Sequence, residues 1–329
     1  MPDIRHVSRS APPTGGRRAV GTARRGLVCL LVLGAASCSS SYEEPPRSDP
    51  GTAAVESATP PAPLAEEVAA AGELVALEEQ FDARLGVYAV DTGSGRTLAH
   101  RADERFAHAS TIKALAVGAL LARTSAADLQ RSVPIERSDL AAGHSPVTGT
   151  RVGAAMTLQE LCDAAVRHSD NTALNLVLQE LGGPAGLDAA LEAMGDDVTQ
   201  VSRTEPDLNS VVPGDPRDTT TPRALANGLR AYAVDGLGVD AEDREQLADW
   251  LRRNTTGDTL IRAGVPGDWV VGDKTGTAAY GTRNDVAVLV PPGRAPIVVA
   301  VMSSRDQLDA AHDDALLAAA ARVVVTAFR

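Results

Sequence analysis

Ser110-Thr111-Ile112-Lys113 opens the apolar segment 110–121 and decides how the rest of the chain is read. A serine hydroxyl is a poor nucleophile at neutral pH unless a base lies beside it. Residues three apart on a helix share a face about one turn from each other, so Lys113 would lie next to Ser110. Alone, the tetrapeptide equally fits the exposed start of an ordinary helix. It predicts a reactive serine only if partners occur elsewhere.

Three polar clusters further along the chain supply such partners. They are Ser169-Asp170-Asn171, Glu205-Pro206-Asp207-Leu208-Asn209 and Lys274-Thr275-Gly276. Taken singly, the first fits a polar helix cap or turn, and the last a solvated lysine at a strand end. Together with Ser-x-x-Lys and in this order, they match a set of motifs that accompanies acyl transfer to serine. The complete set is therefore far more specific than any of its members.

The four clusters together resemble those of the class A serine β-lactamases, in the superfamily that also holds the penicillin-binding proteins. The resemblance runs from about Leu64, and most clearly from Phe106, through the C-terminal helix. Residues 203–209 and 217–220 are similar to the family's Ω-loop, and residues 274–285 to its substrate-edge strand. The resemblance implies hydrolysis of the β-lactam amide of penicillins, and of some cephalosporins, through a serine acyl-enzyme, an activity that confers antibiotic resistance.

The resemblance assigns a catalytic task to four residues. Ser110 would attack the lactam carbonyl, and Lys113 and Glu205 are both candidates for the base that activates it. Ser169 would relay a proton to the lactam nitrogen as the C–N bond breaks. Glu205, positioned with Asn209, would hold and deprotonate the water that hydrolyses the ester, which separates a turnover enzyme from a protein that stays acylated.

The resemblance also implies residues that hold the substrate and the loop. The substrate-binding set is Asn171, Asn209, Lys274, Thr275, Gly276, Thr277 and Arg283. Within it, Lys274, the two threonine hydroxyls and Arg283 would bind the substrate carboxylate. The oxyanion would lie between the backbone N–H groups of Ser110 and Thr277. Arg203 and Asp218 are expected to pair across the ends of the loop, or else to be two surface charges.

Strand patterns at both ends of the chain enclose a helical middle. Helical spacing covers residues 64–81, an apolar hairpin follows over 85–100, strands are expected at 269–272, 285–290 and 296–302, and a final helix at 309–328. This pattern predicts an α/β (α+β) fold with a mixed β-sheet flanked by the N- and C-terminal helices. The expected domain, residues 64–329, divides into an α/β subdomain (64–107 and 252–329) and an all-α subdomain (108–251), with the active site in the cleft between them.

Composition limits the classes of partner. A chain of 329 residues with 44% hydrophobic residues can bury a substantial core. Its net charge of −12 argues against binding nucleic acid or anionic lipid, and 3% aromatic residues provide no stacking platform. The six histidines have no paired metal-ligand spacing, and no glycine-rich phosphate loop is present. We expect a monomer that acts on a small-molecule β-lactam with no metal and no cofactor.

The N-terminus is typical of an export signal rather than of a folded element. Arginine pairs precede a short apolar run and small residues, so residues 1–37 are predicted to be a signal peptide for either the general or the twin-arginine route. Cys38 then stands where a bacterial lipoprotein carries its lipid, and residues 38–63 resemble a flexible tether rich in Ser, Pro, Ala and Glu. The mature protein is expected on the outer face of the cytoplasmic membrane as a lipoprotein, or secreted.

Cys162 is the one cysteine expected in the folded body, since Cys29 would leave with the signal. A disulfide within the mature domain is therefore excluded. Some class A relatives pair a cysteine at this position with one on the nucleophile's helix, where this chain has Val117. We expect Cys162 to be a buried, inert thiol.

Three functional readings from different classes fit the serine and lysine motifs. A β-lactam hydrolase needs Glu205 for turnover, whereas a cell-wall D,D-peptidase should lack the glutamate loop. A β-lactam receptor would acylate once and signal, but the sequence has no spanning helix or cytoplasmic partner domain. The presence of Glu205 favours the hydrolase.

Overall fold

The computed structural model describes residues 65–329. The predicted signal peptide, Cys38 and the tether lie outside the described residues. Between residues 65 and 329, no helix is both long and apolar enough to cross a bilayer.

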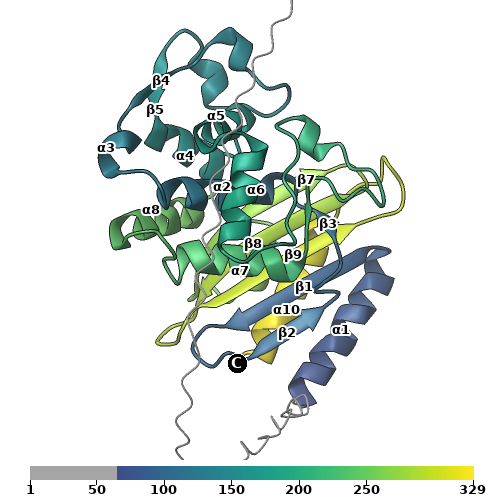
Figure 1. Cartoon of the computed structure of the whole chain (residues 1–329). Helices are drawn as coiled ribbons and strands as arrows, with labels where there is room; N and C mark the ends of the chain where they lie inside the picture. The colour runs from purple at the N-terminus through teal and green to yellow at the C-terminus, as the bar shows by residue number, and fades with distance from the viewer. Residues whose placement is uncertain (1–64) are drawn as a thin grey trace, which may run out of the picture. The chain divides into compact units, whose positions relative to one another are not determined.

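A five-stranded sheet in the order β2-β1-β9-β8-β7 lies between helices on its two faces (Figure 1). Its strands are β1 Arg84–Asp91, β2 Thr97–His100, β7 Val270–Ala278, β8 Thr282–Val290 and β9 Ile297–Ser304. The predicted hairpin is confirmed, because β1 pairs with β2 across the turn at residues 92–96. All neighbours pair antiparallel. The sheet was expected to be mixed, but hairpins join β1 to β2, β7 to β8 and β8 to β9, and a hairpin makes its strands antiparallel.

Helices cover both faces of this sheet, which gives the α+β fold that the sequence predicts. On one face α1 Ala65–Phe81 and α10 Asp314–Ala327 pack together, and on the other α7 Pro222–Ala233 lies against β1, β8 and β9. Side chains of β1 alternate between these layers: Leu85 and Val87 join the core beneath α10, whereas Tyr88 joins the core beneath α7. This alternation follows from the two-residue period of a strand.

The helical middle of the chain surrounds one completely buried helix, α2 Ile112–Leu121. The other helices of this part are α3 Ala126–Leu129, α4 Leu158–Arg167, α5 Asn171–Leu181, α6 Pro184–Ala193 and α8 Ala241–Arg252. Gly118 lets α2 approach α7 closely, because a Cβ there would lie 2.5 Å from the ring of Tyr232. Apart from Lys113 the helix is apolar on all sides, and such a helix is stable only when it is enclosed in this way.

Smaller elements connect these layers. One is the short helix α9 Ile261–Gly264. Two are pairs of short strands: β3 Phe106–Ala107 pairs with β6 Thr219–Thr220, and β4 Ser132–Pro134 pairs with β5 Ala155–Thr157. The others are the 3₁₀ turns η1 Ala109–Thr111, η2 Arg137–Asp139, η3 Thr148–Thr150 and η4 Asp207–Asn209. The pairing of β3 with β6 joins the strand before Ser110 to the end of the predicted Ω-loop.

Several predicted boundaries differ from the structure; β8, for example, begins at Thr282 rather than at residue 285. The last helix begins at Asp314 rather than at residue 309, because the carboxylate of Asp313 caps it by accepting a hydrogen bond from the Ala315 N–H. Strand β7 joins the expected strand at 269–272 to the expected edge strand at 274–276 as one element that ends at Ala278, and each of its residues pairs with β8. The Lys-Thr-Gly motif therefore lies on the edge strand of the sheet.

Candidate active site

The predicted nucleophile Ser110 lies in the 3₁₀ turn η1, directly before α2. Lys113 is in the first turn of that helix, and its Nζ lies 2.9 Å from Ser110 Oγ. Its side chain is completely buried. The i, i+3 spacing of the motif therefore brings the two groups into contact, as the sequence predicts.

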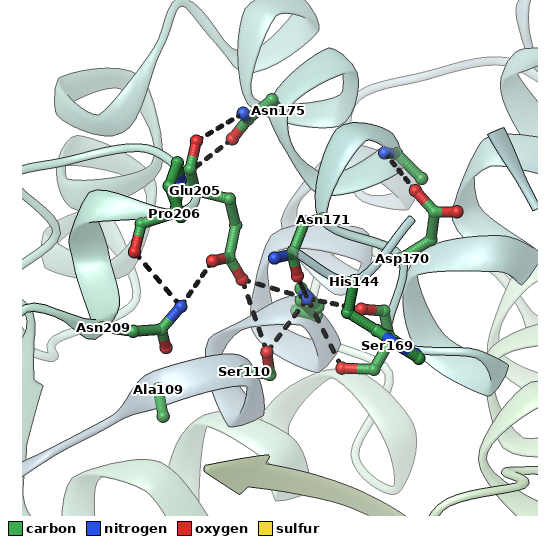
Figure 2. A network of polar contacts seen from close by, with 12 residues as sticks. Ala109, Ser110, His144, Ser169, Asp170, Asn171, Asn175, Glu205, Pro206 and Asn209 are labelled. Atoms are coloured by element: carbon green, nitrogen blue, oxygen red, sulfur yellow. Dashed lines mark hydrogen bonds and ion pairs between the residues drawn. The ribbon is translucent and has the colours of Figure 1, made fainter. Parts of the chain in front are cut away.

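Lys113 Nζ is the centre of a buried polar network, in which Figure 2 shows the labelled Glu205, Ser169 and Asn171 around Ser110. The ammonium nitrogen lies 3.0 Å from Glu205 Oε1. It also lies 2.7 Å from both the Ser169 carbonyl oxygen and Asn171 Oδ1. Burial lowers the pKa of Lys113, and the Glu205 carboxylate opposes that shift. A lysine with a lowered pKa holds more of the neutral amine, which can accept a proton.

Glu205 enters the network from the loop that runs over residues 203–218. Ser110 Oγ donates to Glu205 Oε1 at 3.4 Å, and Asn209 Nδ2 donates to Glu205 Oε2 at 2.5 Å. Asn175 of α5 clamps the backbone of Glu205 from both sides, donating to its carbonyl at 2.9 Å and accepting from its N–H at 2.8 Å. The sequence analysis missed Asn175; its place four residues after Asn171, on the same helix face, is the signal that points to it.

The Ser169-Asp170-Asn171 segment joins α4 to α5. Asp170 is completely buried and caps α5, accepting from the Ala173 N–H and also from the Thr148 N–H and hydroxyl. Ser169 has a left-handed backbone, with φ of +53°. The cap thus fixes a turn that directs the Ser169 hydroxyl into the network, and the helix-cap and catalytic interpretations of this motif are compatible.

Lys274 completes the network from strand β7. Its Nζ donates to Ser169 Oγ at 3.0 Å and to the Thr275 carbonyl at 2.7 Å, and the side chain is buried. Burial lowers the pKa of Lys274 well below its usual range, and the charge of Lys113 lowers it further. The Ser169 hydroxyl therefore lies between two lysines, since Lys113 Nζ is 3.4 Å away on its other side.

The rest of the Lys-Thr-Gly strand lies against the nucleophile turn. A Cβ at Gly276 would lie 3.1 Å from the His108 carbonyl and 3.2 Å from Ser110 N, which explains why this position carries glycine. The Thr275 hydroxyl is 2.6 Å from that of Thr256. The edge of the sheet and the start of α2 therefore form one surface.

Thr277 and Arg283 lie together at the end of this surface. Arg283 Nη1 donates to Thr277 Oγ1 at 2.7 Å, and Arg283 Nε donates to Asp314 Oδ1 at 2.7 Å. Asp314, the first residue of α10, was not predicted, because nothing in the local sequence indicates that the last helix returns to this strand. It holds the guanidinium beside the threonine hydroxyl.

Arg203 and Asp218 are in contact across the ends of the loop, with Arg203 Nε 2.5 Å from Asp218 Oδ2. The Asp218 side chain is 1% exposed, and its Oδ1 also accepts the backbone N–H groups of Ser202 and Arg203. The interaction is therefore more than a surface ion pair, because breaking it would strand a buried carboxylate.

Two further buried carboxylates lie behind Lys274. Asp273 contacts Arg262 Nε at 2.5 Å and Asn254 Nδ2 at 2.6 Å. Asp285 accepts one bond, from the Ile261 N–H, and burial together with the charge of Asp273 raises its pKa well above the usual range. These groups were not predicted; their charges oppose the lowering of the Lys274 pKa.

Within residues 65–329, no group of three or more His, Cys, Asp or Glu side chains is arranged to hold a metal ion. Cys162 is a free, buried thiol, as predicted, and burial raises its pKa above the usual range. A thiol that stays protonated is a poor nucleophile. It takes no part in the network.

The geometry supports acyl transfer to Ser110. Two basic groups contact its hydroxyl, a second hydroxyl lies between two lysines, and a guanidinium with threonine hydroxyls can hold an anionic substrate group. A nucleophile with adjacent bases and a nearby proton relay is the arrangement that nucleophilic catalysis requires.

Comparison with known proteins agrees with this geometry. The model of the beta-lactamase enzyme family matches residues 66–328. A beta-lactamase of Amycolatopsis lactamdurans is 60% identical over 270 residues, which cover 82% of this chain and 87% of that protein. A beta-lactamase of Bacillus licheniformis is 52% identical with the same coverage.

Solved structures give the same result. The crystal structure of a class A beta-lactamase from Clostridium kluyveri DSM 555 superimposes with a TM-score of 0.78 at 44% identity, over 79% of this chain and 99% of that one. A halotolerant bacterial beta-lactamase superimposes with a TM-score of 0.75 at 49% identity, over 77% and 97% of the two chains.

Proposed function

The chain belongs to the β-lactamase enzyme family, and from that membership and the Ser110 network we propose that it is a class A serine β-lactamase. It hydrolyses the β-lactam amide of penicillins, and of some cephalosporins, through an ester on Ser110. One observation carries the proposal: the Glu205 carboxylate reaches both Lys113 Nζ, at 3.0 Å, and Ser110 Oγ, at 3.4 Å. A carboxylate there can activate water against the ester.

In acylation, Ser110 Oγ attacks the lactam carbonyl and its proton passes to a base. Lys113 Nζ, at 2.9 Å, and Glu205 Oε1, at 3.4 Å, are both within reach of that proton. The negative charge on the former carbonyl oxygen is stabilised by the backbone N–H groups of Ser110 and Thr277. When the C–N bond breaks, the Ser169 hydroxyl gives its proton to the lactam nitrogen and takes one from Lys113 or Lys274.

In deacylation, Glu205 removes a proton from water, whose oxygen attacks the ester carbonyl; the C–O bond to Ser110 then breaks and the proton returns to Ser110. Asn209 holds the other carboxylate oxygen of Glu205, and Asn175 fixes its backbone. The substrate carboxylate binds near Thr275, Thr277 and Arg283, and Asn171 holds the side-chain amide of the substrate.

The protein as produced should be tested by steady-state hydrolysis of a penicillin and a chromogenic cephalosporin, with intact-protein mass spectra taken alongside. Sustained turnover without an accumulating adduct supports a β-lactamase. One equivalent of stable adduct without turnover would move the assignment to a penicillin-binding protein or a β-lactam receptor.

We propose further that residues 1–37 direct export, that Cys38 accepts a lipid, and that residues 38–63 tether a domain of two subdomains, residues 64–107 with 252–329 and residues 108–251. The sequence pattern around Cys38 supports the anchor. Fatty-acid labelling of the intact chain, with Cys38→Ser as the control, tests it; absence of label from the wild type would mean plain secretion. Light scattering tests the proposed monomer.

A further inference from the structure

His108 is a buried titratable side chain beside the nucleophile that the steps above do not use. Its exposed fraction is 0%. Its backbone is held on both sides, because its N–H donates to the Asp218 carbonyl at 3.1 Å and its carbonyl accepts from the Thr111 hydroxyl at 2.5 Å. Its ring Nδ1 lies 3.1 Å from the carbonyl oxygen of Ala109.

The partners of the ring define its tautomer. A carbonyl oxygen can only accept, so Nδ1 carries the proton and donates it to Ala109. Burial lowers the pKa of His108, which keeps the ring neutral and leaves Nε2 as a bare acceptor. The backbone carbonyl of Gln200 also faces the ring and, like that of Ala109, opposes the lowering of its pKa, but the enclosed Nε2 has no donor or acceptor within hydrogen-bond distance among residues 65–329. Of these two carbonyls, that of Ala109 is the one within hydrogen-bond distance of a ring nitrogen in the described part of the chain.

The carbonyl of Ala109 belongs to the peptide whose N–H is that of Ser110. A peptide unit is planar and trans, so its C=O and N–H point in opposite directions and turn together. Ala109 has φ of +48°, a left-handed conformation that costs energy for a residue other than glycine. This peptide needs support to keep its orientation, and the Ile112 N–H and the His108 ring provide it from the carbonyl side.

We propose that His108 is a positioning residue for the oxyanion site: its Nδ1–H holds the Ala109 carbonyl so that the Ser110 N–H is aimed at the reacting carbonyl oxygen of the substrate. The inference rests on the proposed function, which makes that N–H an oxyanion donor. The bond also polarises the peptide, which strengthens its N–H as a donor. The close approach of Gly276, whose Cβ would lie 3.2 Å from Ser110 N, ties the same peptide to strand β7.

The test compares His108→Leu with His108→Asn, because the asparagine amide branches where the imidazole carries Nδ1 and can make the same donation. Both are placed in a Glu205→Gln enzyme, in which the ester accumulates. Two quantities are measured with a penicillin: the acylation rate, and the infrared stretch of the ester carbonyl, which reports hydrogen bonding in the oxyanion site. Leu317→Ala, a substitution in the separate core beneath α10, controls for lost stability.

Removing an oxyanion donor outright costs about 10²–10³ in rate. His108→Leu keeps the Ser110 N–H donor and changes only how firmly its orientation is held. We therefore expect acylation to slow about tenfold and the ester carbonyl stretch to move to higher frequency. His108→Asn restores most of both, and Leu317→Ala changes neither. An unaltered rate and stretch in the leucine variant of an active enzyme would overturn the inference alone, whereas a wild type without turnover would overturn the proposed function and the inference with it.

A measurement on the wild type needs no variant that might misfold. Nitrogen-15 NMR of the histidine rings distinguishes the two neutral tautomers. The inference requires the Nδ1–H form for the buried ring of His108. The Nε2–H form would leave the Ala109 carbonyl without this donor and would contradict it.

Discussion

Replacing Asn175 by alanine should slow deacylation much more than acylation. The side chain makes two hydrogen bonds to the backbone of Glu205, at 2.8 and 2.9 Å, and nothing else on α5 substitutes for them. With a net value of about 1 kcal/mol for each bond, the loop loses about 2 kcal/mol of preference for the position that places the carboxylate. At 1.36 kcal/mol for each factor of ten, deacylation should fall up to about 30-fold.

Pre-steady-state kinetics with a penicillin separates the two steps, because an adduct accumulates only when deacylation becomes slower than acylation. Intact-protein mass spectra should show this adduct for Asn175→Ala and not for the wild type. Gln179→Ala, an exposed substitution on the same helix, serves as the control and should behave as the wild type. Equal slowing of both steps, or an unchanged deacylation rate, would refute the view that Asn175 acts by placing Glu205.

Three other substitutions have defined outcomes. Gly276→Ala puts a Cβ 3.2 Å from Ser110 N and should reduce the acylation rate about tenfold. Gly267→Ala, which has open space around its Cβ, should leave that rate unchanged. Equal acylation rates of the two variants in stopped-flow assays would refute the steric argument. Arg203→Ala strands the buried carboxylate of Asp218 and should slow deacylation, so an unchanged burst profile would exclude the pair from the mechanism. Asp285 has a raised pKa, so the folded state binds its proton more tightly than the unfolded state does, and stability is lost as pH rises from about 3.8 towards the folded pKa. Asp285→Asn should remove this loss of stability. Curves of Tm against pH that stay parallel for the two proteins would contradict the prediction.

The contacts within each motif could be predicted from the sequence because they are local, whereas the catalytic roles proposed for the motifs came from the family resemblance. Ser110 and Lys113 are one helical turn apart, so their contact follows from helix geometry, and Lys274 to Thr277 alternate on a strand. The fold class followed from the strand patterns at the two ends of the chain. Motif order, rather than any distance along the chain, indicated that these segments meet.

What could not be predicted depends on contacts between distant segments. Asp314 reaches Arg283 because the last helix packs against the sheet, and Asn175 reaches Glu205 because α5 lies beside the loop. The role of His108 depends on a tautomer and on the positive φ of Ala109, neither of which has a sequence signal. These residues support the reacting groups, and their types, Asn, Asp and His, are common at ordinary turns and caps.

Deacylation of Ser110 by Glu205 is the central claim, and the mass of the Glu205→Gln enzyme after exposure to a penicillin tests it most directly. We predict that this variant gains one equivalent of covalent adduct that persists for many wild-type turnovers, while the wild type, sampled in parallel, shows turnover and no lasting adduct. Rapid turnover by Glu205→Gln without an adduct would show that another group hydrolyses the ester and would contradict the account.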